Sequence, residues 1–166
     1  MEILSNILNW DGKSVKDISK IYDQFSAQNE FTENIIKALT DTNLQSGATW
    51  LLKRYMSEGG TLHPNLIVLI YKYLPLLDHW ESKLHILQSM EYMPIPTNQK
   101  KVTLRFLRAS LKDQNKLVRA WAYNGFHLFA HQFHEYKEER DKLFSKAINN
   151  EAASVKARIR NILKAS

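Results

Sequence analysis

Three histidines in the C-terminal half are the first residues whose types and spacing could do chemistry. They are His127, His131 and His134. In a helix, which turns by about 100° per residue, their side chains lie within about 60° of one another. Neutral imidazoles on one face can bind a transition metal. However, three ligands from one helix rarely converge on one ion, and the chain has no cysteine to complete a site. We therefore expect solvated or capping histidines, no metal and no cofactor.

Motifs of the common catalytic sites do not occur in the sequence. It has no glycine-rich phosphate loop, no His-Glu-x-x-His zinc motif and no Gly-x-Ser-x-Gly nucleophile motif. No pair of carboxylates can be assigned to a common pocket either. We therefore expect a protein that is not an enzyme.

Basic side chains are concentrated in the second half of the chain, where they could neutralise an anionic partner. The formal net charge is +6. Residues 1–91 hold 8 Lys and Arg against 11 Asp and Glu, whereas residues 92–166 hold 15 against 6. Such asymmetry suits a nucleic acid or another polyanion, but the same side chains could simply solvate exposed helix faces. The charge pattern leaves both interpretations open.

The elements that must position these residues are predicted to be helices. Gly occurs only 5 times and Pro only 4 times, and apolar residues recur with helical spacing along most of the chain. We expect breaks at Gly59-Gly60, at Pro75 and, most clearly, at Pro94-Ile95-Pro96. No alternating strand pattern is present, so the predicted class is all-α. The expected helices cover roughly 14–25, 32–39, 43–57, 65–77, 80–90, 98–111, 115–133, 135–148 and 152–164.

An internal repeat organises these helices into pairs. The turns within the pairs carry Asp41, Asp78, Asp113 and Asn150, at separations of 37, 35 and 37 residues. Each is expected to cap the helix that follows it. Since one hairpin is too small to bury its own apolar face, about four hairpins should stack into a right-handed α-α superhelix around a shared core.

This repeat leads to a prediction for the domain organisation. We expect a single domain over residues 1–166, with residues 1–29 forming an N-terminal capping segment that contains one extra helix. A seam is possible near residues 92–98, where the prolines interrupt the helical pattern.

Tryptophans recur near the start of the predicted second helices. Trp50, Trp80 and Trp121 occupy such positions. Their regular placement indicates packing between neighbouring hairpins rather than a binding cage. Trp10 lies before the repeats and should either seal the N-terminal end or be exposed.

The segment 111–122, Leu-Lys-Asp-Gln-Asn-Lys-Leu-Val-Arg-Ala-Trp-Ala, resembles the second half of a HEAT repeat, a unit related to the armadillo repeat. The family pattern has a turn Asp followed six residues later by Arg, here Asp113 and Arg119. Asn150 and Lys156 are similar in the next hairpin. The resemblance covers residues 99–164, is weaker over 30–91 and is absent from 1–29. It implies a HEAT-like superhelix that serves as a non-catalytic scaffold for a protein partner.

Such a stack implies a concave face lined by the second helix of each hairpin. On the helix over 115–133 a polar strip carries cations, a histidine and a tyrosine, and the helix over 152–164 adds three more cations. The cations could neutralise phosphates, and the tyrosine could stack on a base. Alternatively, Asp113, Arg119 and Lys156 could hydrogen-bond between neighbouring repeats, as such residues do in the family. The candidate binding residues are Lys116, Arg119, Tyr123, His127, Lys156, Arg160 and Lys164.

Two classes of partner remain open at this point. A protein partner is the leading prediction, and DNA bound by the basic C-terminal half is the alternative. Some HEAT-like proteins are DNA glycosylases for alkylated bases, which need an acidic residue on the concave face. The candidates here, Asp41, Asp78 and Asp113, all lie at turns. If DNA is the partner, we therefore expect binding rather than base excision.

Features that direct a chain to a membrane or out of the cell are not evident. The longest apolar stretch, Leu66–Leu77, is shorter than a membrane span and contains Lys72. The segment 1–10 carries Glu2 and no basic residue, so we expect no secretory signal. The lack of cysteine suits a reducing compartment. We therefore expect a cytoplasmic protein with no membrane partner.

Overall fold

The structure, a computed structural model, describes residues 2–166 and contains ten α-helices and no strand in that range. The prediction of an all-α fold is thus confirmed. Short 3-10 turns follow several of the helices. In chain order the helices are α1 (Glu2–Asn9), α2 (Val15–Phe25), α3 (Phe31–Lys37), α4 (Gln45–Ser57), α5 (Pro64–Lys72), α6 (Trp80–Ser89), α7 (Lys100–Ser110), α8 (Lys116–Gln132), α9 (Lys137–Asn150) and α10 (Ala153–Ala165).

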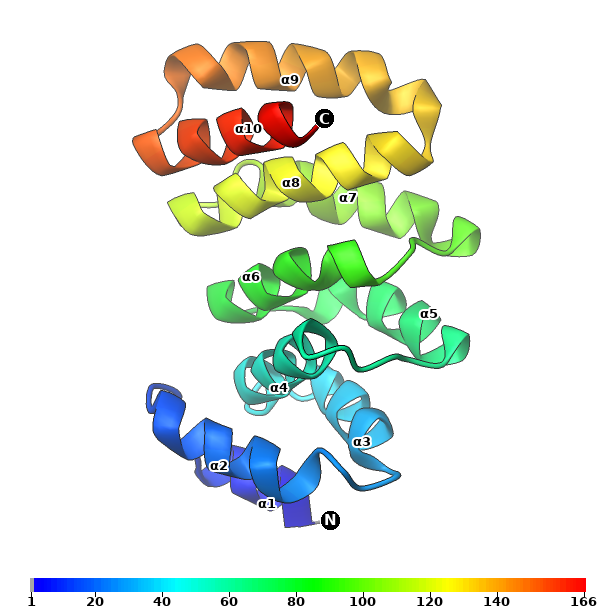
Figure 1. Ribbon diagram of the computed structural model, residues 1–166, viewed down its shortest axis with the longest axis vertical. Coiled ribbons are helices and arrows are strands. Elements are labelled where there is room, and N and C mark those ends of the chain that lie inside the picture. Colours follow the sequence, from blue (N-terminus) through cyan, green and yellow to red (C-terminus); the bar gives the residue numbers. More distant parts are fainter. Residues whose placement is uncertain (1) are drawn as a thin grey trace.

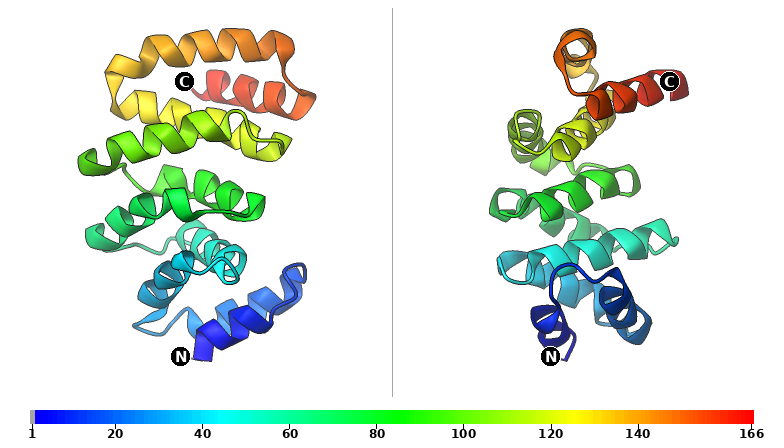
Figure 2. Two further views of the ribbon diagram at one scale, coloured as in Figure 1. Left: turned by 180° about the vertical axis from the view of Figure 1, so that it is seen from behind. Right: turned by 90° about the vertical axis from the view of Figure 1, so that its left-hand side faces the viewer.

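Four helical hairpins, α3 with α4, α5 with α6, α7 with α8 and α9 with α10, follow one another along the long axis (Figure 1). The second helices form a continuous layer, because α4 packs on α6, α6 on α8 and α8 on α10. Behind this layer α3 packs on α5, and α5 packs on α7. Figure 2 shows the two layers edge on in its right-hand view. One apolar core runs through all the hairpins, from Ile3 to Ile162.

The N-terminal segment holds two helices, α1 and α2, where the sequence predicted one. They pack on each other, α1 also on α3 and α2 also on α4. Ile3 and Ile7 of α1 are buried. Gly47 of α4 allows this close approach, because a Cβ added there would lie 2.6 Å from Cγ2 of Ile7. Trp10 packs beside the same glycine and helps to close this end of the core. The apolar residues of α1, Ile3, Leu4, Ile7 and Leu8, have helical spacing, but its eight residues fall short of the window of about 11–18 residues over which such spacing identifies a helix.

Helix ends follow the predicted breaks. Helix α4 ends at Ser57, and Gly59, two residues later, has φ +94, the left-handed conformation that glycine adopts without steric cost. Helix α5 ends at Lys72, and Pro75 lies in the 3-10 turn that follows. The segment with Pro94 and Pro96 separates two 3-10 turns between α6 and α7.

The predicted caps at the hairpin turns fall one to three residues too early, because the N-cap positions are Leu44, His79, Asn115 and Ala152. Asp113 accepts a hydrogen bond from the backbone of Asn115 at 2.8 Å and so closes the turn rather than capping a helix. Asn115 is the residue that caps α8, because its backbone is extended and its side chain accepts from Leu117 and Val118. Asn150 is still the last residue of α9.

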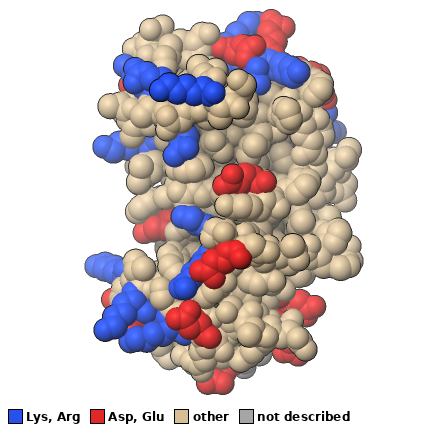
Figure 3. Space-filling view, viewed as in Figure 1, with Lys and Arg blue, Asp and Glu red and all other residues tan. Residues whose placement is uncertain are grey.

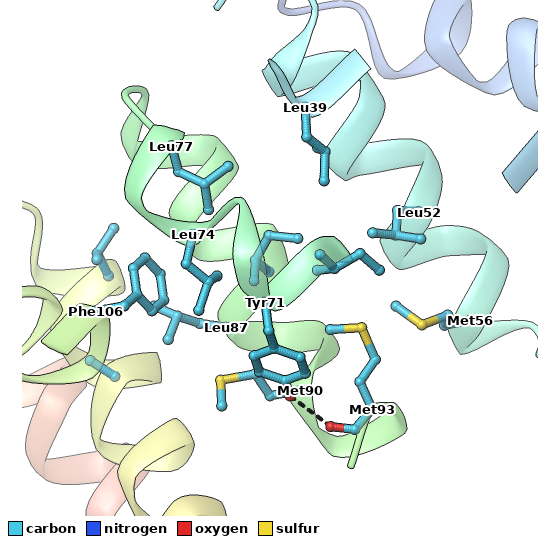
Figure 4. Close-up of a cluster of buried hydrophobic side chains, with 14 of the residues drawn as sticks. Leu39, Leu52, Met56, Tyr71, Leu74, Leu77, Leu87, Met90, Met93 and Phe106 are labelled. Atoms are coloured by element: carbon cyan, nitrogen blue, oxygen red, sulfur yellow. Dashed lines mark hydrogen bonds between the residues drawn. The ribbon is translucent and has the colours of Figure 1, made fainter. Parts of the chain in front are cut away.

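The centre of the core contains one buried side-chain hydrogen bond that ties two hairpin segments together. Tyr71 of α5 is 0% exposed, and its hydroxyl donates to the backbone oxygen of Met93 at 2.6 Å (Figure 4). This oxygen follows α6 in the chain, so the bond holds the α6–α7 connection against α5. Because the site is buried, water cannot replace the donor if it is lost.

We therefore expect Tyr71→Phe to lower the free energy of unfolding by about 1–2 kcal/mol, since it leaves a buried carbonyl unsatisfied. Urea unfolding followed by circular dichroism measures this change. The matched control is Tyr92→Phe, at a position that is 44% exposed, where the change should stay within about 0.5 kcal/mol. Equal effects of the two substitutions would contradict the role of the Tyr71 hydroxyl.

Helices α4 and α6 share another polar contact, which is partly buried. The Nδ1 atom of His85 lies 3.0 Å from the hydroxyl oxygen of Thr49. Burial, together with the nearby charge of Lys53, lowers the pKa of His85 from 6.5 to about 4. The imidazole is therefore neutral in the folded protein at neutral pH.

This lowered pKa predicts a loss of stability on mild acidification. Below pH 6.5 the unfolded chain binds a proton at His85 that the folded chain does not bind until about pH 4, so folding becomes less favourable as the pH falls between these values. The loss should reach about 2 kcal/mol from about pH 6.5 to about pH 5. Urea unfolding of the protein and of His85→Gln over this range isolates the effect. A pH dependence that is the same in both proteins would refute the prediction.

Candidate functional site

The structure separates the seven candidate binding residues rather than aligning them on one solvent-facing strip. Three of the side chains are exposed, three are half-buried, and the tyrosine is only 6% exposed. The exposed ones are Lys116, Arg160 and Lys164, the half-buried ones are Arg119, His127 and Lys156, and the buried one is Tyr123.

Two of the candidates on α8 face helix α9. The ring of Tyr123 packs edge-on against Phe144 of α9 at 5.8 Å, and the imidazole of His127 stacks on the same ring at 6.3 Å. Burial raises the pKa of Tyr123 and lowers that of His127. Because Tyr123 is enclosed, its ring is not available to stack on a base. The prediction that it belongs to a solvent-facing polar strip is therefore wrong. A one-sided projection fails for α8, since α6, α7, α9 and α10 all pack around it.

Arg119 connects two hairpin turns. Its guanidinium binds the carboxylate of Glu151 through Nε at 3.1 Å and 3.2 Å and through Nη2 at 3.2 Å. Its Nη1 donates to the backbone oxygens of Asp113 at 2.9 Å and Gln114 at 3.2 Å. Arg119 thus does form hydrogen bonds between neighbouring hairpins, as one of the two interpretations predicted. Its partner in the next hairpin is Glu151, which the sequence did not identify.

The two preceding hairpins are joined in the same way. In α6, Lys83 Nζ lies 3.6 Å from Asp113 Oδ2 in the next turn. In α4, the amide of Gln45 donates to the backbone oxygen of Leu76 at 2.7 Å and accepts from the backbone of Asp78 at 3.1 Å. We call these bonds, from the first turn of one second helix to the turn of the next hairpin, the junction contacts. The two partners of a junction contact are 30–33 residues apart in the sequence. This spacing is the one signal in the sequence that could have identified them, and the Asp–Arg pattern does not contain it.

The solvent side of the second-helix layer carries large apolar side chains. Trp50 and Trp121 are half-buried against the core, whereas Trp80 and Leu117 are each 41% exposed. The predicted core role is therefore wrong for Trp80, because it is the first residue of α6 and lies beyond the packed part of the helix. We call this set of partly exposed side chains on the adjacent helices α4, α6 and α8, namely Trp50, Trp80, Leu117 and Trp121, the tryptophan face.

Arginines flank the tryptophan face. The guanidinium carbon of Arg158 in α10 lies 4.0 Å from the centre of the Trp121 ring, which is cation–π geometry. At the other end, the guanidinium carbon of Arg54 lies 5.7 Å from the Trp50 ring. The space-filling view in Figure 3 shows this side of the molecule, with Lys and Arg gathered over α10 near the top.

A groove of about 630 Å³ opens beside Trp80, between the first turn of α6 and the turn that joins α7 to α8. The ion pair of Lys83 with Asp113 crosses it. Asp78, on the same wall, is exposed and has no Lys or Arg within 4 Å among the residues that the structure describes. The lining residues are Asp78, His79, Trp80, Lys83, Asp113, Gln114 and Asn115.

Positive charge remains unneutralised on α10. All six carboxylates of residues 92–166 lie within 4 Å of a Lys or Arg side chain. Lys156, Arg160 and Lys164 have no such partner within the described part of the chain. The terminal helix therefore presents cations that an external anion could approach.

No group of three or more His, Cys, Asp or Glu among residues 2–166 is arranged to hold a metal ion. Within the same range no helix is both long and apolar enough to cross a membrane. Comparisons with protein-family models, with curated protein sequences and with solved structures found no match to this chain.

The junction contact of Arg119 makes a testable contribution to stability. Its side chain is 20% exposed and that of Glu151 18%, so Arg119→Met removes the guanidinium that binds a shielded carboxylate and two carbonyls. We expect the free energy of unfolding to fall by about 1–3 kcal/mol in urea. The control, Arg160→Met on the exposed face of α10, should change it by less than about 0.5 kcal/mol. A loss as small for Arg119 as for Arg160 would show that the contact is not structural.

Proposed function

We propose that this chain is a non-catalytic, HEAT-like interaction module that binds a protein partner through the tryptophan face. The observation that carries the proposal is the gathering of large, partly exposed apolar side chains on adjacent second helices. Tryptophan and arginine are the residues most enriched at the energetic centres of protein interfaces. Trp121 beneath Arg158 is such a pair.

The HEAT-like part of the proposal rests on the arrangement of the hairpins. Four of them follow one another with their second helices in contact, and junction contacts recur between them. We interpret residues 1–166 as one right-handed superhelix, with α1 and α2 as its N-terminal cap. A stack held in this way presents its face without reorganising, which lowers the entropic cost of binding.

The groove beside Trp80 favours a basic segment of the partner. Asp78 supplies a free carboxylate and Trp80 an exposed ring, and a Lys or Arg side chain can interact with both. Such a side chain would enter the groove while apolar residues of the partner cover Leu117 and Trp121. The free carboxylate and the exposed apolar side chains therefore both favour a partner segment that combines basic and apolar residues.

Site-specific photocrosslinking in cells that produce the full chain tests the proposal. Trp80→benzoylphenylalanine should give discrete adducts with a protein, and Asp78→Lys in the same chain should abolish them through charge repulsion. The matched control is Lys137→benzoylphenylalanine, at an exposed position on α9, which should give none. No adduct from position 80, or the same adducts from both positions, would reject the tryptophan face as the binding surface.

Nucleic-acid binding is the second candidate function, and the cations of α10 support it. Lys156, Arg160 and Lys164 lack carboxylate partners and lie on one helix, the last of the second-helix layer. Phosphate contacts of this kind need no base recognition and give affinity that depends strongly on salt. Because Tyr123 is buried, this form of the hypothesis rests on phosphate contacts alone.

Fluorescence anisotropy with a duplex at several salt concentrations tests this second candidate. If the three cations bind phosphates, changing Lys156, Arg160 and Lys164 to Gln together should lower the slope of log K against log salt by about 3. A control with Lys101, Arg105 and Lys137 changed to Gln alters the net charge equally and should leave the slope nearly unchanged. The absence of binding at low salt would remove the hypothesis.

A further inference from the structure

A second hollow lies away from the tryptophan face, between helices α7 and α9 and over the side of α8 that Tyr123 occupies. Its volume is about 410 Å³, within the range of sites that enclose small molecules. It is lined by Arg108, Leu111, Lys112, Tyr123, Glu139, Leu143, Lys146, Ala147, Asn150 and Glu151.

Long side chains, rather than close apolar packing, bridge the two helices here. Arg108 of α7 donates to both carboxylate oxygens of Glu139 in α9, each at 2.9 Å. Earlier in the stack the corresponding helices pack directly, α3 on α5 and α5 on α7. The span of the Arg108–Glu139 pair thus leaves room beneath it.

The floor of the hollow is apolar apart from one hydroxyl group. Leu111 and Ala147 are buried and Leu143 is half-buried. The hydroxyl of Tyr123 makes no hydrogen bond to any other residue of the range 2–166. Burial raises the pKa of this hydroxyl, so it stays protonated and can donate.

The rim of the hollow carries net positive charge. Both acidic residues of the lining are already neutralised, Glu139 by Arg108 and Glu151 by Arg119. Lys112 and Lys146 are exposed and have no carboxylate within 4 Å among the described residues. Two free ammonium groups therefore stand at the edge of an apolar floor.

We propose that this hollow binds a small amphipathic anion, namely a carboxylate attached to an aliphatic or aromatic body. The body would cover Leu111 and Leu143, and the carboxylate would accept hydrogen bonds from Lys112, Lys146 and the Tyr123 hydroxyl. Ammonium donors bind a carboxylate more strongly than neutral donors do, which favours an acid over an alcohol of the same shape. This site is independent of the tryptophan face.

Titration of the full chain with octanoate and with 1-octanol, followed by calorimetry and by NMR shifts of α7 and α9, tests the proposal. Octanoate should bind at least about tenfold more tightly than 1-octanol. Changing Lys112 and Lys146 to Gln together should weaken octanoate by about tenfold, and Tyr123→Phe by about threefold. Leu143→Trp should fill the hollow and abolish binding of both compounds.

The matched control changes Lys101 and Lys137 to Gln, since both are exposed cations outside the lining, and octanoate should then bind as before. The proposal is overturned if octanoate does not bind at millimolar concentration, if 1-octanol binds equally well, or if the double variant at Lys112 and Lys146 binds like the unchanged protein. Both of these lysines are exposed, so their variants should fold even if Tyr123→Phe does not, and circular dichroism checks this.

Discussion

Alignment of the hairpins depends on the junction contacts. At each of three junctions a polar side chain from the first turn of a second helix holds the turn of the next hairpin: an amide at Gln45, an ammonium at Lys83 and a guanidinium at Arg119. The position is constant although the chemistry changes, because any long donor can reach the turn that lies one hairpin away. With the turns held in this way, the second helices lie side by side, and each surface of the protein follows from that placement.

This constraint also decides which residues remain free to interact. Arg119 is neutralised by Glu151 and does not contribute free positive charge to the surface. Tyr123 and His127 pack against Phe144 of α9 and are therefore shielded from solvent. What remains outside is an apolar strip on the second helices, flanked by arginines, and cations on the terminal helix. The protein thus presents an aromatic face along the stack and a positively charged end.

The sequence predicted those features of the fold that are local in origin. The helical class and the breaks at Gly59 and Pro75 follow from spacing and from the backbone limits of glycine and proline, which act within a few residues. Helix α1 was missed because its apolar residues, although helically spaced, extend over only eight residues. The caps were misplaced because an aspartate can close a turn as readily as it caps a helix.

The candidate site was less predictable, because exposure depends on neighbours that are distant in the sequence. A helical wheel assigns one side of α8 to the core, but helices on several sides enclose its polar residues as well. Glu151 and Gln45 could not be identified as partners, since a degenerate repeat does not fix which polar group of a turn receives the bond. Trp80 lies outside the core because it is the first residue of α6. Apolar periodicity predicts which side of a helix is buried, but it does not predict where the helix begins.

The change in chemistry along the junction contacts has a mechanical consequence. The first junction uses a neutral amide bonded to backbone groups, whereas the next two use charged pairs. Dissolved ions weaken the attraction between opposite charges, but they leave the hydrogen bonds of a neutral amide nearly unaffected. In concentrated electrolyte the stack of hairpins should therefore stay stiff at its N-terminal junction and become more pliable at the two junctions that follow.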